Sequence, residues 1–429
     1  MSKFQVPRGT QDIFGKQMEQ WSYLEDLIEA ICKVYNYQKI KTPMFEHTEV
    51  FNRDNDSSDM VNKEMYTFSD AGGRSLTLRP EGTAGVIRSF VEHKMFGNPD
   101  LPVKLYYVEP NFRYERPQKG RMRQHHQFGV EVIGIKSHLI DVEVIDLGYS
   151  FLKLLGLKEL KVIINTLGDS VSRTNYQKAL SEYFKNPVKE LCSDCQRRYL
   201  QNPLRILDCK IDKNNDIVKN APKLNDYLSA ESKVYFDKVL KTLELLEIPY
   251  QVDYSLVRGL DYYGDTVFEV VSCNENMGSQ ATIFAGGRYD KFVEYYGGPE
   301  LSGMGFGMGV ERLLVALESE GIDIGNSADV DVYIMPLEDQ VLDYSLELAT
   351  LLRAHGYSAD LSYQSKKFKS LFNSADRKKA KVVFIIGTDE LNNQQVTMKH
   401  LALQQQVTIT TDQAINQLDK WFKGEDHEH

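Results

Sequence analysis

The segment Glu109–Glu131, EPNFRYERPQKGRMRQHHQFGVE, constrains the fold more than any other part of this chain. Apolar residues over 104–108 and over 128–135 predict two β-strands. Pro117 and Gly120, which lie between these runs, are typical of a hairpin loop. The segment therefore predicts two strands joined by a long loop.

The predicted loop is cationic and is held at each end by a strand. Pro110 is expected to end the first strand, because proline has no N–H to give to a sheet. An arginine guanidinium makes paired, charge-assisted hydrogen bonds, so a group of arginines suits a phosphate partner. A solvated surface loop is the alternative, because most runs of charge are only solvated. The charged residues of the loop are Arg113, Glu115, Arg116, Lys119, Arg121 and Arg123.

The composition is that of a globular chain with two or three domains. The 429 residues are 42% hydrophobic and 26% charged. No apolar run approaches the ~18 residues of a membrane span, and the start, MSKFQVPRGTQD, resembles neither a signal nor a transit peptide. We therefore expect a cytoplasmic protein with no membrane contact. The net charge of −10 means that any nucleic-acid contact uses local basic patches.

Cysteines are too few in so long a chain to form a disulfide framework. Cys192, Cys195 and Cys209 could supply three zinc ligands, but no second CxxC motif and no nearby histidine supplies a fourth. We therefore expect free thiols and no metal site, with a structural zinc as the open alternative. The five cysteines are Cys32, Cys192, Cys195, Cys209 and Cys273.

The sequence FRYE, followed by a basic turn, resembles the second signature motif of class II aminoacyl-tRNA synthetases. The full form RYERPQKGRMRQ resembles histidyl-tRNA synthetases in particular. The resemblance implies that Arg113 contacts the α-phosphate of ATP, Glu115 the adenine amino group and Arg121 the distal phosphates. Gln127 and Glu131, four residues apart on one strand face, are expected to line the histidine pocket, where Glu131 accepts a hydrogen bond from the imidazole.

Position 125 departs from this family, which usually has a phenylalanine that stacks on adenine. A planar imidazole can still stack, so His125 is expected to contact ATP. A metal site formed by His125 and His126 is the other interpretation, but adjacent strand residues face opposite ways. Gln118 and Arg123 are the loop residues expected to bind tRNA, with Gln118 a candidate reader of the extra 5′ guanosine of histidine tRNA.

A helix is predicted over 18–35, where apolar residues recur at spacings of three and four. A strand over 40–46 follows, broken by Pro43 and therefore suited to an edge or an interface. This helix and strand resemble the first class II motif, which builds the dimer interface in that family. The resemblance implies a homodimer.

The sequence LRPEGT places Glu81, Gly82 and Thr83 at the N-terminus of a helix predicted over 84–93. This motif is characteristic of histidyl-tRNA synthetases, where these positions hold the α-amino group of histidine. The alternative is a plain helix cap by Thr83, with Glu81 favourably placed near the helix dipole.

Two further blocks, VRGLDYY and AGGRYD, distinguish histidyl-tRNA synthetases from other class II enzymes. The resemblance places Arg258 near the α-phosphate and the substrate carboxylate, and Tyr262 and Tyr263 around the imidazole. The first block precedes a predicted strand over 266–272, and the second follows one over 281–284. From the residues alone, both blocks are also consistent with surface turns, with Arg258 in a salt bridge.

The glycine-rich run GMGFGMGVERLL, 303–314, predicts a strand that enters a helix. Its spacing does not fit the dinucleotide motif GxGxxG, and no βαβ unit surrounds it. It resembles the third class II motif. The resemblance implies that Arg312 contacts the γ-phosphate of ATP and that the small residues leave room for the nucleotide.

A Lys/Glu/Leu-rich segment over 170–249 predicts a helical insertion in a catalytic domain that spans 1–325. It is comparable to the family's insertion over the acceptor stem. A tail over 423–429 is expected to be disordered.

Strands and helices alternate over 330–422, which predicts a small α/β domain similar to the anticodon-binding domain of class IIa synthetases. Basic residues around its second helix are either solvated or in contact with a phosphate backbone. The predicted order is strand 330–335, helix 338–355, strand 358–361, helix 367–380, strand 381–387, strand 395–400, strand 407–411 and helix 412–423.

These motifs together predict an α/β (α+β) fold: a class II antiparallel sheet flanked by helices, with a helical insertion and a C-terminal α/β anticodon-binding domain. The resemblance implies a homodimeric histidine–tRNA ligase that uses ATP and Mg²⁺ to form histidyl-adenylate and then charges tRNA(His). Arg113 and Arg258 would stabilise the charge of the transition state. The alternative is a catalytically inactive synthetase paralogue that regulates a histidine-biosynthetic phosphoribosyltransferase, and a class IIa ligase for another amino acid is a second rival.

Overall fold

The computed structural model describes residues 4–52, 60–207, 209, 211–256, 262–274, 277, 281–325 and 329–425. The chain divides into two compact units. The larger unit comprises Met1–Phe14 and Trp21–Ile324, and the smaller unit comprises Gly15–Gln20 and Gly325–His429.

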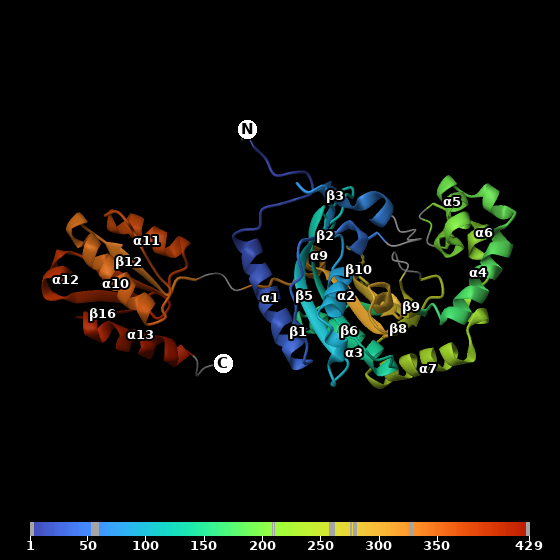
Figure 1. The fold of residues 1–429 in the computed structure, drawn as a ribbon. Helices are drawn as coiled ribbons and strands as arrows, with labels where there is room; N and C mark the ends of the chain where they lie inside the picture. Colours follow the sequence, from blue (N-terminus) through green and yellow to red (C-terminus); the bar gives the residue numbers. More distant parts are fainter. Residues whose placement is uncertain are drawn as a thin grey trace. The chain divides into compact units, whose positions relative to one another are not determined.

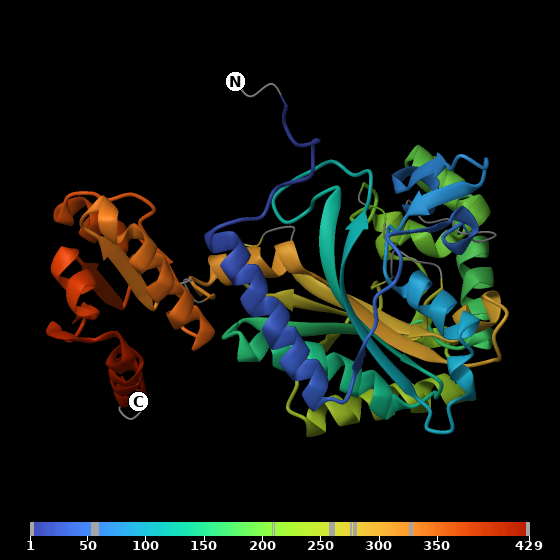
Figure 2. The ribbon, with the colours of Figure 1, turned by 60° about the vertical axis from the view of Figure 1, so that its left-hand side comes forward.

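In the described residues, the larger unit is built on an eight-stranded sheet with the order β1-β5-β6-β11-β10-β9-β7-β8 (Figure 2). Neighbouring strands are antiparallel except at the two edges, where β1 is parallel to β5 and β7 is parallel to β8. The predicted antiparallel sheet is confirmed. Its strands are β1 (Gln38–Lys39), β5 (Val103–Phe112), β6 (Gln124–Ile133), β7 (Leu160–Thr166), β8 (Tyr250–Val252), β9 (Gly264–Ser272), β10 (Thr282–Tyr289) and β11 (Gly303–Gly309).

The predicted hairpin is formed by β5 and β6, but its first strand does not end at Pro110. Strand β5 continues to Phe112 and pairs Pro110 with His126. The Pro110 carbonyl accepts a hydrogen bond from Arg79 Nε at 2.7 Å, on the edge of β5 that faces away from β6. Because the N–H and C=O of a strand residue point to the same side, the missing N–H of Pro110 removes no bond from the β5–β6 ladder.

A three-stranded sheet with the order β2-β4-β3 lies next to the N-terminal end of α2 (Figure 1). The strand predicted over 40–46 is wrong: 40–44 have no strand structure, and strands lie on either side of them. Thr42, inside this stretch, is buried and bonded to side chains instead of to a neighbouring strand. The small sheet contains β2 (Phe45–His47), β3 (Tyr66–Ser69) and β4 (Ser75–Leu78).

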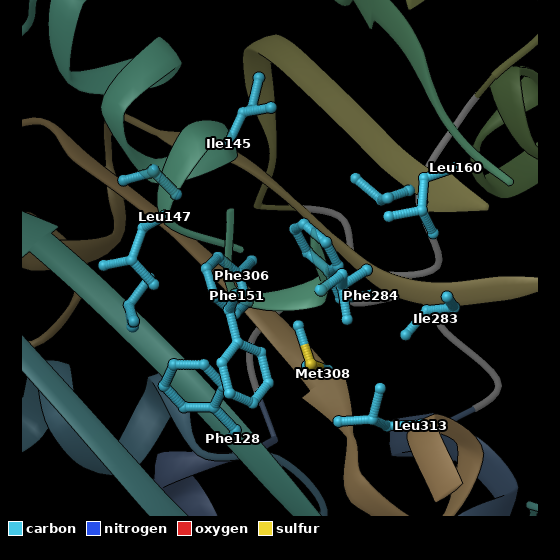
Figure 3. Packing of buried hydrophobic residues seen from close by; sticks show 14 of the residues in the cluster. Phe128, Ile145, Leu147, Phe151, Leu160, Ile283, Phe284, Phe306, Met308 and Leu313 are labelled. Atoms are coloured by element: carbon cyan, nitrogen blue, oxygen red, sulfur yellow. The ribbon is translucent and has the colours of Figure 1, made fainter. Parts of the chain in front are cut away.

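One face of the large sheet packs against four helices and forms the largest hydrophobic core. Phe128 of β6 contacts both Phe151 and Phe306, and its ring centroid is 5.7 Å from that of Phe151 and 5.4 Å from that of Phe306 (Figure 3). These edge-to-face aromatic contacts join the sheet to the helix that carries Phe151. The four helices are α1 (Lys16–Val34), α3 (His138–Leu154), α7 (Ala230–Leu245) and α9 (Val310–Ser319).

The opposite face of the sheet is covered in part by α2 (Thr83–Glu92) and α8 (Phe292–Tyr295). Strand β11 alternates between the two faces: Met304, Phe306 and Met308 are in the largest core, and the glycines between them lie on the α2 side. The uncovered part of this second face is the floor of the cavity described below.

Helices α4 (Ser170–Phe184), α5 (Ser193–Gln201) and α6 (Asp216–Lys219) form a lobe with its own small core (Figure 1). Between 170 and 249 the described residues contain helices and no strand. The last of these helices, α7, packs on α3, and its Phe236 and Val239 belong to the largest core and not to the lobe.

The smaller unit is a five-stranded sheet, in the order β13-β12-β14-β15-β16, that packs against helices. Most predicted elements are present, but the short helix α12 was not predicted, because its polar sequence TDELNN has no apolar face. The predicted tail begins inside the last helix, and 426–429 lie outside the described residues. The elements are β12 (Val332–Pro336), α10 (Leu342–Ala354), β13 (Ala359–Leu361), α11 (Phe368–Arg377), β14 (Val382–Ile386), α12 (Thr388–Asn393), β15 (Gln395–His400), β16 (Gln405–Thr410) and α13 (Thr411–Glu425).

No helix in the described parts of the chain is both long enough and apolar enough to cross a bilayer.

A buried ion pair connects three segments of the larger unit. Arg79 Nη1 donates to Glu109 Oε2 at 2.5 Å, and both side chains are 3% exposed or less. Thr42 donates to the same carboxylate through its N–H at 2.8 Å and its hydroxyl at 3.0 Å. Arg79 also binds the carbonyls of Thr42 and Pro110. The pair therefore holds the segment after β1, the segment before α2 and strand β5 together.

We predict that Arg79→Met destabilises the larger unit by ~3–5 kcal/mol, because it leaves the Glu109 carboxylate buried without its cation. The measurement is the urea-induced unfolding of the full chain. Arg79→Met/Glu109→Leu should recover most of the loss, since both charges are then gone. Lys39→Ala, which breaks the exposed Lys39–Glu29 pair, is the control and should change little. Wild-type stability in Arg79→Met would contradict the prediction.

Candidate active site

A cavity of about 670 Å³ lies on the α2 side of the large sheet. Residues from β5, β6, β10, β11, the β5–β6 loop and the N-terminus of α2 line it, and α5 of the lobe contributes to its wall. The cavity brings together ten residues predicted from sequence: Glu81, Thr83, Arg113, Glu115, Arg121, His125, Gln127, Tyr262, Tyr263 and Arg312.

The other predicted residues lie elsewhere. Glu131 is fully buried directly behind the cavity wall, and Gly82 lies at the start of α2. Gln118 and Arg123 are in the β5–β6 loop but do not line the cavity. Arg258 lies outside the described residues, so its predicted role stays a prediction.

Three arginines concentrate positive charge at one end of the cavity: Arg113, Arg121 and Arg312. Arg113 Nε donates to the Pro80 carbonyl at 2.7 Å, which fixes the guanidinium beside the N-terminus of α2. Arg312 Nη1 donates to the Thr282 carbonyl at 2.9 Å. These contacts occupy one nitrogen of each side chain with a neutral acceptor. The positive charges of Arg113, Arg121 and Arg312 all act on the neighbouring His125, so this part of the cavity attracts an anion.

Arg121 forms an ion pair with the side chain of Glu115, and both residues line the cavity. Backbone hydrogen bonds between Gln118 and Arg121 close a tight turn, in which Gly120 has a φ of +70°. Arg123 packs its guanidinium over the Tyr114 ring at 4.0 Å and donates to the Glu115 carbonyl. The loop is thus held by its own contacts.

Glu81 caps helix α2 with its carboxylate, which accepts hydrogen bonds from the N–H groups of Thr83 and Ala84, both at 2.9 Å. The cap is therefore made by Glu81 and not by Thr83, the residue that the plain-cap alternative required. Glu81 is 4% exposed and still lines the cavity. A carboxylate at this position can also accept from an ammonium group in the cavity.

Glu131 is buried among hydroxyl groups. Tyr289 donates to Oε2 at 2.5 Å and Tyr107 donates to Oε1 at 3.4 Å. Burial raises the pKa of Glu131 to about 8, against the opposing effect of hydrogen bonds from Thr83, Tyr289 and Tyr107. With this pKa, the carboxyl can be neutral or ionised near neutral pH. Such a group can bind a ligand that also gains and loses a proton near neutral pH.

The glycines of β11 make room for the polar side chains of β6. A Cβ on Gly305 would lie 2.1 Å from Glu131 Oε2, and one on Gly307 would lie 1.9 Å from Gln127 Nε2. Gly129 does the same for Tyr107, whose ring a Cβ would approach to 2.2 Å. From the sequence, this space was predicted to accommodate the nucleotide. In the structure, the side chains of Glu131 and Gln127 occupy it and lie against the sheet.

His125 lines the cavity beside the three arginines. Burial lowers the pKa of His125 to about 3, and the positive charge of Arg113 adds to the effect. The imidazole is therefore neutral at physiological pH and can stack on a planar ring. Its neighbour His126 faces the other way: its N–H and ring Nδ1 bind Glu311 of α9, and its ring lies 4.5 Å from that of Trp21. This contradicts a metal site formed by the two histidines.

Tyr262 and Tyr263 form an aromatic wall of the cavity, with ring centroids 4.6 Å apart. Tyr262 also stacks on Phe292 of α8 at 4.4 Å. The two rings are tilted by 47° to each other, and aromatic faces of this kind can pack against a planar ligand.

The block AGGRYD is not a turn, because most of it lies inside strand β10. Arg288 is fully buried and binds Asp141 of α3, with Nε donating to Oδ1 at 2.9 Å. Its next residue, Tyr289, points to the other face and binds Glu131.

Sequence analysis missed two site residues, Tyr107 and Tyr289. Each lies opposite a glycine on the neighbouring strand, Gly129 for Tyr107 and Gly303 for Tyr289. A tyrosine paired with a glycine across two strands is the signal that could have identified them, since the missing side chain leaves space for the ring.

The chain is similar to known proteins over almost its whole length. The family model described as Histidyl-tRNA synthetase matches residues 9–313, and the Anticodon binding domain model matches residues 331–421. A histidine–tRNA ligase of Bacillus licheniformis is 51% identical over 397 residues, 92% of this chain and 94% of that protein. Its counterpart in Bacillus subtilis is 47% identical over 422 residues, 98% of this chain and 100% of that protein.

The crystal structure of apo histidyl-tRNA synthetase from S. aureus matches with a TM-score of 0.84 and 41% identity, over 97% of this chain and 100% of that one. The larger family model covers well over half of the chain. The chain belongs to the histidyl-tRNA synthetase family, which confirms the resemblance and the fold class that the motifs indicated.

We predict that Glu131 makes the protein less stable as the pH rises from about 4.5 to about 8. Over this range the carboxyl is ionised in the unfolded chain but neutral in the folded one, so unfolding releases its proton. Glu131→Gln lacks this group and should lose less stability between pH 6 and pH 9, by on the order of a few kcal/mol. Thermal unfolding at both pH values measures the difference.

The control is Glu300→Gln, which removes an exposed carboxyl of the same unit and should follow the wild type at both pH values. Parallel pH profiles for the wild type and Glu131→Gln would show that Glu131 has an ordinary pKa.

Proposed function

We propose that this chain activates histidine with ATP to form histidyl-adenylate and pyrophosphate, and then transfers histidine to the 3′ end of tRNA(His). The observation that carries the proposal is one cavity that joins two unlike ends. Three arginines around His125 form one group, the basic end, and Glu81 and Thr83 beside the buried Glu131 form the other, the acidic end. Arg113 lies where the two groups meet, because it binds the carbonyl of Pro80.

The acidic end suits the amino acid. Glu81 would accept hydrogen bonds from the α-ammonium of histidine, with Gly82 and Thr83 beside it at the start of α2. Gln127 would face the substrate, since its oxygen is already held by Asn111 at 2.9 Å. Glu131 would bind one nitrogen of the imidazole, next to Tyr262 and Tyr263.

Selection of histidine follows from buried polar groups. A site whose polar groups are satisfied only by a hydrogen-bonding ring rejects analogues without those atoms by ~10⁴-fold or more. Glu131 is held so deeply that an apolar ring would leave its carboxyl without a ligand partner.

The basic end suits ATP. Arg113 would bind the α-phosphate, Arg121 the distal phosphates and Arg312 the γ-phosphate, while the neutral His125 would stack on adenine. Glu115, now paired with Arg121, would turn to the adenine amino group when the phosphates take its partner. Arg258 would approach the α-phosphate from the opposite side, a role that rests on its sequence motif.

The reaction needs positioning and charge stabilisation, and no side chain becomes covalently attached. A carboxylate oxygen of histidine attacks the α-phosphorus, the bond to the bridging oxygen breaks, and pyrophosphate leaves. Arg113, fixed by Pro80, would stabilise the added charge on the α-phosphate without reorganisation. A terminal ribose hydroxyl of the tRNA then takes the acyl group, and AMP leaves.

Magnesium would enter with the nucleotide. It is a hard cation that binds carboxylate and phosphate oxygens, and Glu269, which accepts from Thr282 Oγ1 at 2.9 Å, is one of the cavity-wall carboxylates beside which it would lie. Both oxygens of Glu311 are already used by the His126 N–H. The ion would withdraw charge from the departing phosphates.

The parts outside the cavity suit tRNA. The smaller unit, from about 330 to 422, would bind the anticodon, and exposed lysines around α11 offer phosphate contacts. The catalytic domain would span 1–325, with the lobe as its helical insertion over the acceptor stem. Gln118, exposed at the loop tip, and Arg123 behind it would contact the acceptor end.

We also propose a cytoplasmic homodimer. Met44, Phe45 and Phe68 are 44% to 52% exposed, and Phe45 and Phe68 are in ring contact at 6.3 Å. Exposed apolar groups of this kind mark association surfaces. Light scattering on the purified chain tests this, and the mass of a single chain at micromolar concentration would contradict it.

A catalytically inactive regulator of a phosphoribosyltransferase is not favoured. The chain matches full-length histidine–tRNA ligases and carries the anticodon-binding region. Its ATP-binding arginines Arg113 and Arg312 are both in the cavity.

We predict that the purified chain exchanges labelled pyrophosphate into ATP only when histidine is present. Arg113→Ala should slow exchange by ~10²-fold or more, because one transition-state donor is lost. Arg258→Ala, chosen from sequence, should do the same. Arg116→Ala, on the exposed side of the same loop, is the control and should exchange at the wild-type rate.

The same assay with other amino acids excludes a ligase of different specificity. Absence of exchange with histidine in a folded protein would refute the proposed function and favour the regulatory alternative.

We predict that Gln118→Ala reduces the preference for tRNA(His) with its extra 5′ guanosine by about tenfold, since one side-chain hydrogen bond is worth ~1 kcal/mol or slightly more. Aminoacylation of transcripts with and without that base measures the preference. Pyrophosphate exchange should be unchanged, because the Gln118 side chain lies outside the cavity. Equal preference in wild type and variant would remove Gln118 from the tRNA contact.

A further inference from the structure

Four side chains in the lobe converge on one point. Cys192 precedes α5, Cys195 lies in its first turn, and Cys209 and Asp212 follow the turn Pro203–Ile206. One ligand atom from each lies within 4.8 Å of all the others. Cys195, Cys209 and Asp212 are buried, and Cys192 is partly exposed.

The spacing of the ligand atoms fits a tetrahedral metal centre. The Cys192 and Cys209 Sγ atoms are 3.7 Å apart, and Cys209 Sγ is 3.7 Å from Asp212 Oδ2. Two sulfurs bound ~2.3 Å from one tetrahedral zinc lie ~3.8 Å from each other. A disulfide would need ~2.05 Å. The two sulfurs are therefore at the separation of ligands to one ion and not at that of a covalent bond.

Backbone N–H groups orient these ligands. The N–H of Asp212 donates to Cys209 Sγ at 3.4 Å, and the N–H of Cys192 donates to Asp212 Oδ2 at 2.9 Å. Such bonds stabilise a thiolate and a carboxylate in the charged forms that bind metal. Without a metal, the Asp212 carboxylate accepts from the Cys209 thiol; with a metal, the same oxygen and sulfur are in position to bind one ion.

We propose that Cys192, Cys195, Cys209 and Asp212 bind one structural Zn²⁺ ion. Three soft thiolates exclude Mg²⁺ and Ca²⁺, which take oxygen ligands, and favour zinc. All four positions come from the chain, so the site is closed and has no place for a reacting water. Only three ligands were predicted from the sequence, because neither a histidine nor a fourth cysteine lies nearby. The fourth ligand is a carboxylate, Asp212, three residues after Cys209.

The ion joins the start of α5 to the turn after 203–206, in a lobe whose core is small. A core of this size gains from a metal that closes a loop. Asp194 and Arg198 of α5, and Ile211 beside the ligands, lie on the wall of the active-site cavity. Zinc therefore fixes the part of the lobe that faces the site, independently of which reaction that site performs.

The test is the zinc content of the full-length chain, purified in a reducing buffer without chelators and measured by mass spectrometry of the metal. Wild type should contain about one zinc per chain, because the four ligands form a single tetrahedral site. Cys195→Ser and Asp212→Asn should retain less than about one tenth of this, because each lacks a direct ligand. Cys273→Ser, an exposed cysteine elsewhere in the chain, is the matched control and should keep full zinc.

A second measurement uses only the wild-type protein, so its result does not depend on whether a ligand variant folds. Wild type loaded with Co²⁺ should show thiolate-to-metal charge-transfer absorption and the intense visible bands of a tetrahedral site. Wild type without zinc and without the cobalt spectrum would overturn the proposal, as would a Cys192–Cys209 disulfide in the protein or full zinc retention in both ligand variants. Histidine-dependent pyrophosphate exchange would still report separately on the proposed function.

Discussion

The buried pair of Arg79 and Glu109 is the interaction on which the active site depends. It lies between the segment before α2 and strand β5, the two elements that carry Glu81 and Arg113. Breaking a buried pair leaves an uncompensated charge, so the arrangement is stable only with all its hydrogen bonds in place. The next residue, Pro80, gives its carbonyl to Arg113. This network thus fixes the position of Glu81, which would bind an ammonium group, relative to Arg113, which would bind a phosphate.

The second constraint is the alternation of β11. Its large residues fill the core under the sheet, and its glycines leave the upper face flat. Because Glu131 and Gln127 lie over those glycines, their carboxyl and amide groups are held against the sheet by backbone. A side chain at Gly305 or Gly307 would displace them. The glycine-rich strand therefore positions polar groups, and Gly307 and Gly309 also line the cavity.

Much of this organisation could be predicted from sequence, because the motifs are local. The hairpin, the basic loop and the helix after LRPEGT each depend on neighbours within one segment. What could not be predicted depends on contacts between distant segments. Pro110 stays in its strand because Arg79, far away in sequence, takes its carbonyl. Tyr289 binds Glu131 across the one strand that lies between them, β11. Asp212 becomes a candidate ligand only because the fold places it beside Cys192 and Cys195, which lie at the start of α5.

Two buried ionisable groups, Arg288 on β10 and Glu131 on β6, differ in how the fold satisfies them. Arg288 is fully enclosed and meets the carboxylate of Asp141, the hydroxyl of Ser302 and a carbonyl, so its charge is satisfied within the fold. Glu131 is equally buried, but in the described residues its hydrogen-bond donors are hydroxyls, and the nearby Glu81 raises its pKa further. A buried acid without a cation destabilises the fold that holds it. Under the proposed function, an imidazole N–H would donate to this carboxyl and offset part of the cost of burying it.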